Sequence, residues 1–239
     1  MSGLLQMFYA PGLVFDDVRE GRRNWVIPTI AVIVISTILA VVLIQMVGYE
    51  NIVRKSIEGN KAIAERLGPA GVEDAIQKSN TPLRRNLSYV MPGIGSIFVL
   101  LLVSGLLTAI LAIMDSRPSF GKTLAMYSYS YYLYAVVSGL LSLLVLSLMS
   151  DRADADLQHL LMFNAGAILD KETTNRFVYS LASSLDLISI LNLMMISFGL
   201  SKIAPGVSFG KALSAVGALW LIWILIKAGF SFATGGMMG

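Results

Sequence analysis

The chain has 239 residues, of which 56% are hydrophobic and only 14% charged, and its mean hydropathy is +0.73. A water-soluble domain carries roughly 25% charged residues, so this composition excludes a soluble globular protein and indicates a membrane protein. The sequence has no cysteine and one histidine, His159, which excludes disulfides, thiolate metal sites and imidazole clusters. The net charge of +3 is too small for a nucleic-acid-binding protein. No metal ion or other cofactor is predicted.

A short region, residues 1–24, precedes the first apolar stretch. Pro11 stands at a position where a helix can begin, and Leu13, Val14 and Val18 fall on one side of that helix. This pattern predicts a short cytoplasmic helix that lies in the membrane interface. The alternative that the sequence leaves open is an unremarkable polar lead-in.

Five long apolar stretches follow, and about 20 apolar residues suffice to cross a bilayer. Uninterrupted runs of 26, 29 and 28 residues without Asp, Glu, Lys or Arg contain the first three stretches. The fourth contains Asp186, and the fifth is interrupted only by Lys211 and Lys227 near its ends. The sequence therefore predicts an all-α, polytopic membrane protein with five transmembrane helices, at about residues 25–47, 91–114, 124–149, 183–203 and 210–232.

Prolines and glycines refine this assignment. A proline inside a helix breaks a backbone hydrogen bond that lipid cannot replace, so Pro28 and Pro92 are expected in the first turns of spans one and two. The other five prolines lie outside the spans. Small residues allow helices to approach closely, and Gly105 in span two and Gly217 in span five predict such contacts.

The basic residues indicate the orientation. The side that holds the N-terminus has seven Lys and Arg in short connections, whereas the other side has eleven, spread over longer loops together with ten acidic residues. The positive-inside rule weights short loops and residues near span ends, so the N-terminus is expected in the cytoplasm. The long loops 50–89 and 150–182 would then face outward. Within the first of them, apolar residues recur at helical spacing until Gly68-Pro69 breaks the pattern.

A hexapeptide occurs twice, 89 residues apart: residues 119–124 read SFGKTL and residues 208–213 read SFGKAL. Each copy follows a proline-containing connector and opens an apolar stretch. The repeat predicts that spans 2–3 and spans 4–5 are two copies of one helical hairpin in the same orientation. Serine is expected to cap the helix, phenylalanine to anchor at the interface, glycine to allow a tight approach and lysine to reach the headgroups. The connector residues concerned are Phe120, Gly121, Lys122, Phe209, Gly210 and Lys211.

Two ionisable residues, Asp186 and Lys227, lie inside predicted spans, where each is costly unless it is paired or hydrated. Both lie about one turn from the same, outer end of their spans, so an intramembrane ion pair is geometrically permitted. The alternative is that each side chain extends to the interface separately.

Span three carries five tyrosines, of which Tyr127, Tyr131 and Tyr134 fall on one helical face. Phenol hydroxyls in a membrane require hydrogen-bond partners. The pattern predicts either a polar cavity for a lipid headgroup or a small solute, or hydrogen bonds between packed helices.

Several positions together carry a family resemblance. Pro11 is followed by Phe15, and Trp25 is followed by Pro28 at the start of the first span. With the repeated Phe-Gly-Lys connectors and the SLD sequence of residues 184–186, these positions resemble the Yip1 family of multispanning integral membrane proteins.

The resemblance covers about residues 8–230 and implies a five-helix bundle with a cytoplasmic N-terminus. Eukaryotic members of the family are associated with vesicle traffic and Rab GTPases and usually carry a longer polar N-terminal region. Only about 24 residues precede the first span here. This difference argues against a Rab-type GTPase partner and favours a prokaryotic member in the cell inner membrane.

Two functions are predicted. The first is a non-enzymatic Yip1-type protein that organises the membrane or binds lipids, other membrane proteins or a second copy of the chain. The second is a small transporter or lipid-moving protein with a polar cavity near the tyrosines and Asp186. An intramembrane enzyme is disfavoured, because no nucleophile with a base and no paired carboxylates lie within a span. A water-filled cavity joining the tyrosines to Asp186 would favour transport, whereas a tightly packed interior with an apolar groove would favour a partner-binding role.

Overall fold

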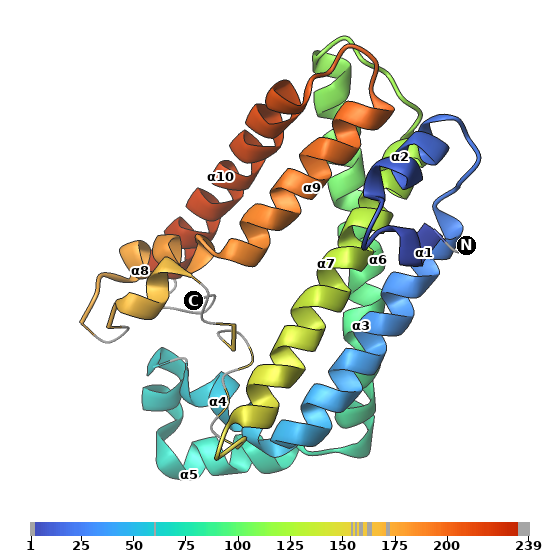
Figure 1. The fold of residues 1–239 in the computed structure, drawn as a ribbon. Coiled ribbons are helices and arrows are strands. Elements are labelled where there is room, and N and C mark those ends of the chain that lie inside the picture. The colour runs from blue at the N-terminus through green and yellow to red at the C-terminus, as the bar shows by residue number, and fades with distance from the viewer. Residues whose placement is uncertain are drawn as a thin grey trace. The chain divides into compact units, whose positions relative to one another are not determined.

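The structure is a computed structural model that describes residues 3–59, 61–153, 155, 157, 160–161, 164–170 and 173–233. The described residues form helices connected by turns and loops. Within this described part, one isolated β-bridge pairs Asn164 with Asp186. In chain order the helices are α1 (Gly3–Gln6), α2 (Pro11–Arg19), α3 (Val26–Val47), α4 (Tyr49–Glu58), α5 (Lys61–Ser79), α6 (Pro82–Ile113), α7 (Phe120–Leu148), the 3-10 helix η1 (Ala165–Ile168), α8 (Arg176–Ser184), α9 (Leu187–Ile203) and α10 (Phe209–Ala233) (Figure 1).

The chain divides into two compact units, each assembled from separate stretches of sequence. Unit 1 comprises Met1–Thr37, Pro92–Ser138 and Ile188–Trp220. Unit 2 comprises Ile38–Met91, Gly139–Leu187 and Leu221–Gly239. The long helices α3, α6, α7 and α10 contribute residues to both units.

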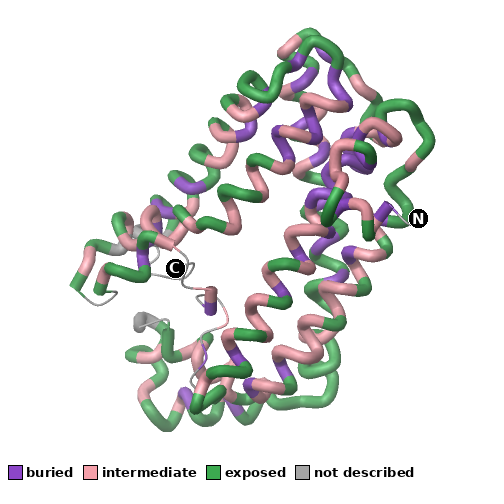
Figure 2. The backbone as a smooth tube through the Cα atoms, viewed as in Figure 1, coloured by how far each residue is buried: buried purple, intermediate pink, exposed green. Residues whose placement is uncertain are grey.

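The core of unit 1 forms where α2 packs against α7 and α9, and the buried stretches of these helices lie together (Figure 2). Val14, Phe15 and Val18 of α2 are fully buried. The ring of Phe15 meets the ring of Phe198 on α9 edge to face, with 6.0 Å between the centroids. Leu13, by contrast, is 59% exposed.

The prediction of a short helix that begins at Pro11 is confirmed, because proline occupies the first turn of α2. The alternative of an unremarkable polar lead-in is wrong. The apolar side of α2 packs on the protein's own helices, because three buried side chains on one face need a dry surface and α7 with α9 supplies it. Location of this helix in the membrane interface stays a prediction.

Helices α3 and α6 approach closely at Gly93. A Cβ atom added there would lie 2.3 Å from Thr37 Oγ1 and 3.0 Å from the carbonyl oxygen of Ile33. At Gly105 and Gly217 no described atom lies within 4 Å of such a Cβ atom. The predicted contacts at those two glycines are therefore wrong, because glycine only permits a close approach and the packing decides which one is used.

Four of the five predicted spans lie on helices long and apolar enough to cross a membrane: α3, α6, α7 and α10. The fourth predicted span, residues 183–203, is not one continuous helix. Helix α8 ends at Ser184 and α9 covers 17 residues from Leu187. Leu185 leaves the helical conformation, with φ −86° and ψ 71°, and the Asp186 backbone pairs with Asn164 instead. The predicted start of this span is therefore wrong.

Pro92 lies inside α6 and not in its first turn, because α6 begins ten residues earlier, at Pro82. The polar residues before the apolar stretch, which include Arg84 and Arg85, extend the helix. Pro92 itself is exposed. Its missing N–H removes one backbone hydrogen bond where the polar segment meets the apolar one, but α6 continues through this position.

In unit 2, the first predicted loop, residues 50–89, is largely helical. Helices α4 and α5 occupy most of it, and Gly68, with φ 64° and ψ 172°, breaks α5 at the predicted position. Arg54 of α4 pairs with Glu73 of α5 at 3.0 Å and also with two glutamates of its own helix. The second predicted loop, 150–182, contains η1 and most of α8 in its described part.

The contact at Gly93 predicts the effect of adding a methyl group. Gly93→Ala should destabilise the protein by about 1–3 kcal/mol, because the new Cβ atom forces α3 and α6 apart. Gly95→Ala is the matched control, since nothing lies within 4 Å of its added Cβ atom, and its better helix propensity should leave stability equal or higher by up to about 1 kcal/mol. Unfolding in detergent micelles measures both, and equal effects would contradict the contact.

Candidate functional site

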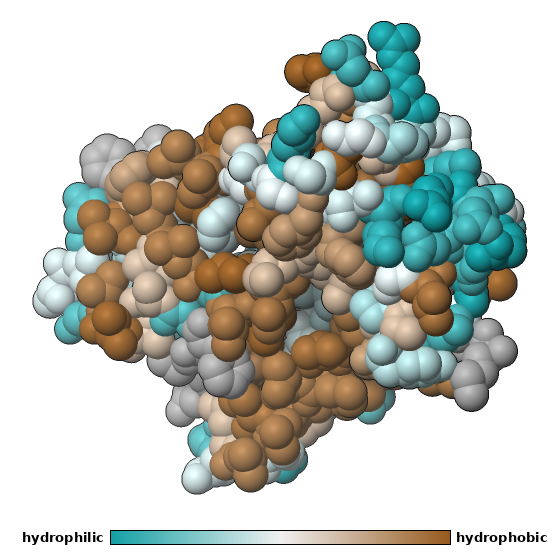
Figure 3. Space-filling view, turned by 45° about the horizontal axis from the view of Figure 1, so that its top comes forward, coloured by the Kyte–Doolittle hydropathy of each residue, from teal (hydrophilic) through white to brown (hydrophobic). Residues whose placement is uncertain are grey.

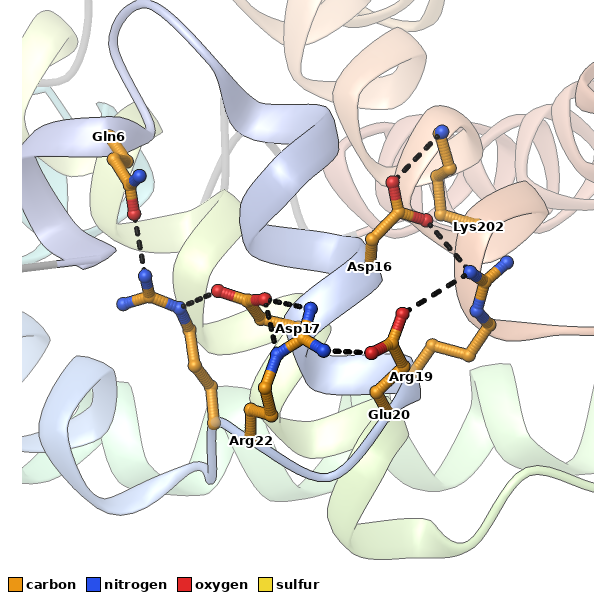
Figure 4. Close-up of polar contacts among 8 residues, drawn as sticks. Gln6, Asp16, Asp17, Arg19, Glu20, Arg22 and Lys202 are labelled. Atoms are coloured by element: carbon orange, nitrogen blue, oxygen red, sulfur yellow. Dashed lines mark hydrogen bonds and ion pairs between the residues drawn. The ribbon is translucent and has the colours of Figure 1, made fainter.

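A cluster of charged side chains organises the N-terminal segment (Figure 4). The carboxylate of Asp17 accepts hydrogen bonds from Nε of Arg22 and from Nε of Arg23, both at 2.8 Å. Arg23 also donates to Oε1 of Gln6 at 2.5 Å, and Arg22 pairs with Glu20. These contacts join α1, α2 and the turn that leads into α3.

Two lysines attach α2 to the following helices. Nζ of Lys202, in the last turn of α9, lies 3.3 Å from Oδ2 of Asp16. Nζ of Lys122, in the first turn of α7, donates to the backbone carbonyl of Arg19 at 2.6 Å. Because Arg19 is the last residue of α2, Lys122 satisfies a carbonyl that has no partner within the helix and places positive charge at the negative end of the helix dipole.

The charged cluster lowers the pKa of Asp17. Hydrogen bonds from the Arg23 and Arg22 guanidinium groups hold the pKa of this carboxyl below its ordinary value. A depressed folded-state pKa means that the contribution to stability is complete above the unfolded-state pKa and is lost as the pH falls through the folded-state value.

A pocket of about 520 Å³ lies in unit 1 between α7 and α9, with the first residue of α10 beside it. It is lined by Ser130, Leu133, Tyr134 and Val137 of α7, by Ile188, Leu191, Asn192, Met194, Met195 and Phe198 of α9, and by Phe209. We call it the α7–α9 groove.

The wall of the α7–α9 groove is almost wholly hydrocarbon and thioether. The hydroxyl of Ser130 donates to the carbonyl of Met126 in its own helix at 3.0 Å. Leu191 and Met194 are 53% and 44% exposed, so the groove is open along its outer side. Apolar side chains also cover much of the surface seen in Figure 3. The groove therefore suits an apolar ligand that reaches it from the side.

The three predicted tyrosines lie along one face of α7. The rings of Tyr127 and Tyr131 are 6.0 Å apart, and those of Tyr131 and Tyr134 are 5.8 Å apart. The shared face is confirmed, but only Tyr134 lines the α7–α9 groove. The groove that it lines is apolar, and a polar cavity formed by all three tyrosines stays a prediction.

The two repeat connectors open helices at the same position, since α7 begins at Phe120 and α10 at Phe209. In the second copy the hydroxyl of Ser208 accepts a hydrogen bond from the Lys211 N–H at 3.3 Å, which confirms the predicted serine cap there. In the first copy the serine offers its backbone carbonyl to the N–H of Lys122 at 2.9 Å.

The glycines of the connectors do not mark a tight approach. An added Cβ atom at Gly121 would meet only Trp25, at 3.8 Å, and nothing described lies within 4 Å at Gly210. That part of the prediction is wrong, because both connectors lie at an exposed end of their helices, where few neighbours come close. The anchoring of Phe120 and Phe209 in a membrane interface stays a prediction.

Asp186 and Lys227 both belong to unit 2 and are half-buried. Asp186 lies in the link between α8 and α9, one residue before α9 begins, and Lys227 lies in the last third of α10. The ion pair between them stays a prediction.

Sequence reasoning missed three features of this region: the Asp16–Lys202 contact, the role of Phe198 and the buried amide of Asn192. Phe198 lines the groove and also packs against Phe15. Oδ1 of Asn192 is buried and has no hydrogen-bond partner among the described residues. The one available signal was the presence of Asn192 in an apolar stretch, since an amide without hydrogen-bond partners is costly in hydrocarbon.

The charged cluster predicts a pH dependence. Lowering the pH below the ordinary Asp value of about 3.9 should lower the thermal midpoint, because protonation of Asp17 removes the acceptor of two guanidinium groups. Asp17→Asn should start from a lower midpoint at neutral pH and show a shallower acid decline. Thermal unfolding of both proteins in detergent across a pH series measures this, and parallel curves would rule out a contribution from Asp17.

The predicted ion pair has its own test. Asp186→Ala should lower the folded yield, and a second change, Lys227→Met, should restore part of it, because the pair of changes leaves no unpaired charge. Size-exclusion yield of the four proteins in the cycle is the measurement. Strictly additive effects would refute the pair.

Comparison with known proteins gives one match. The model of the Yip1 domain family matches residues 5–232, nearly the whole chain. No curated protein and no solved structure matches. The family match agrees with the apolar helices of membrane-crossing length and with the motifs around Pro11, Trp25 and the connectors. This chain is a membrane protein of the Yip1 family.

Proposed function

We propose that this protein is a non-enzymatic organiser of the membrane that binds an apolar ligand in the α7–α9 groove. The observation that carries the proposal is the groove itself, a space of about 520 Å³ with an almost wholly apolar wall and an open outer side. Binding pockets for small ligands commonly have volumes of about 300–1,000 Å³. The ligand is a membrane lipid or an apolar segment of another membrane protein, including a second copy of this chain.

The groove chemistry favours binding over catalysis and transport. Its lining contains one hydroxyl, one phenol and one amide, from Ser130, Tyr134 and Asn192, among apolar side chains. Acid–base or nucleophilic catalysis needs a positioned pair of reactive groups, which this wall lacks. The lining does not include Asp186, whereas a solute path of the kind considered from the sequence would join the tyrosines to that carboxylate.

For the architecture we propose five spans, with α9 as the fourth. Its 17 residues extend about 26 Å at 1.5 Å per residue, slightly less than the roughly 30 Å of a hydrocarbon core. A short span of this kind is accommodated by local thinning of the bilayer or by side chains that reach the interface. Lys202 stands in the last turn of α9, at the end of the span where such a side chain would act.

Burial supports the duplicated hairpin. Residues 89 positions apart, on α6–α7 and on α9–α10, are buried in both copies, as an inherited packing face would require. The pairs are Leu107 and Ile196, Leu111 and Leu200, Thr123 and Ala212, and Tyr127 and Val216.

The orientation with a cytoplasmic N-terminus and the location in a prokaryotic inner membrane belong to the same proposal. Five spans place the termini on opposite sides, and the short connections on the N-terminal side carry seven of the basic residues. The N-terminal segment packs within unit 1 through its own buried side chains, which argues against a role as a free arm for a Rab-type GTPase.

Filling the groove tests the function. Leu191→Trp should remove the co-purifying apolar ligand, because the larger ring occupies the groove, whereas Ile190→Trp, at a 41% exposed position outside the lining, should retain it. Native mass spectrometry of protein released from native membranes identifies the ligand as a lipid or a protein.

Liposomes reconstituted with the unchanged protein or with either tryptophan variant provide a second measurement. We expect neither lipid flipping nor solute flux above that of protein-free vesicles. Flux that Leu191→Trp abolishes would instead establish the transporter, and equal ligand content in both tryptophan variants would overturn the groove as the binding site.

A further inference from the structure

The length of the α7–α9 groove limits what can fill it. Along α9 the lining runs from Ile188 to Phe198, and ten helical steps of 1.5 Å give about 15 Å. This is half of the roughly 30 Å hydrocarbon core, so the groove has the depth of one leaflet. A transmembrane helix of a partner would need an apolar surface about twice as long.

The shape of the wall fits a flexible chain. Met194 and Met195 contribute unbranched thioethers, which adapt to irregular neighbours. Because the Ser130 hydroxyl donates to its own helix, the α7 side offers hydrocarbon apart from the phenol of Tyr134. In a bilayer no hydrophobic force drives two apolar walls together, so a groove of this kind stays open and lipid hydrocarbon fills it.

One end of the groove carries positive charge. Phe198 and Phe209 line this end, and Lys202, one helical turn beyond Phe198, holds its ammonium 5.8 Å from the centre of that ring. Lys211 follows Phe209 by two residues and is exposed. Asp16 contacts both Lys202 and Arg19, and Arg19 also pairs with Glu20. The three cations Lys202, Lys211 and Arg19 outnumber these two carboxylates.

From this combination we infer that the groove binds one acyl chain of an anionic phospholipid, with the lipid phosphate beside Lys202 and Lys211. The inference rests on the proposed function of the groove and adds the class of ligand and its direction. The acyl chain runs along α9 from Phe198 towards Ile188. The exposed Leu191 and Met194 form the open side through which a lipid enters from the same leaflet.

Photo-crosslinking tests the inference. The full-length protein is reconstituted in vesicles that contain phosphatidylglycerol or phosphatidylcholine with a diazirine in the acyl chain, and the adducts are mapped by mass spectrometry. We expect adducts on the groove residues of α7 and α9. Phosphatidylglycerol should be favoured by about fivefold for each lysine beside its headgroup, because it carries a net negative charge whereas the choline cation of phosphatidylcholine neutralises the phosphate. Because the chain has no cysteine, an environment-sensitive label at Met194→Cys gives an independent readout of the same binding.

Matched variants separate the two parts of the inference. Lys211→Gln should reduce the preference for phosphatidylglycerol by about fivefold and leave the labelling by phosphatidylcholine unchanged. Lys78→Gln, which changes an exposed lysine of α5 in unit 2, should change neither. Leu191→Trp should remove the groove adducts and Ile190→Trp should keep them. Lys202→Gln is less suitable, because it also breaks the contact with Asp16.

The outcomes are distinct. Equal labelling of the groove by both lipids would overturn the headgroup selection and leave the groove as an apolar binding site. Adducts that avoid the groove, with a partner's apolar segment cross-linked there instead, would overturn the lipid inference and keep the proposed function. Lipid adducts that avoid the groove, with no other apolar occupant displaced by Leu191→Trp, would overturn both.

Discussion

Hydrocarbon offers no hydrogen bonds to a polypeptide backbone, and this single constraint shapes the described chain. Where the side chains are apolar over long stretches, as in α3, α7 and α10, the backbone satisfies itself as a helix. Departures from helical geometry occur where polar or turn-forming residues stand: Asp115 with φ 57° after α6, Gly68 within α5, and the Leu185–Asp186 link before α9.

The two copies of the repeated connector have the same local structure but different neighbours. Both start a helix at a phenylalanine, and both carry a lysine two residues later. In the first copy Lys122 caps α2 through the carbonyl of Arg19. In the second copy Lys211 lies near the end of the α7–α9 groove that Phe209 lines. The N-terminal segment accounts for the difference, because it packs against the first copy.

The lipid hydrocarbon also explains why the α7–α9 groove is not closed by helix packing. Helices in lipid associate through van der Waals packing and hydrogen bonds and not through the release of water. α2 completes the packing of α7 and α9 at one end, where Phe15 meets Phe198. Farther along, no described side chain fills the space between Tyr134 and Leu191, and in a bilayer the hydrocarbon of the surroundings is an equally good neighbour. The apolar wall can therefore stay open to lipid, as the proposed binding role requires.

The sequence by itself determined that this is an all-helical membrane protein of the Yip1 family, because long uncharged runs, proline placement and connector motifs are one-dimensional features. It also predicted the shared tyrosine face and the break at Gly68, which depend on local periodicity. It could not predict the groove, since a leucine against lipid and a leucine in a groove give the same pattern. The tertiary structure alone decided that α2 buries Phe15 against α9, that Gly93 and not Gly105 brings helices together, and that Asp16 meets Lys202 across 186 residues. Such contacts depend on which helix faces are opposed in space, and a pattern along one chain carries no information on that choice.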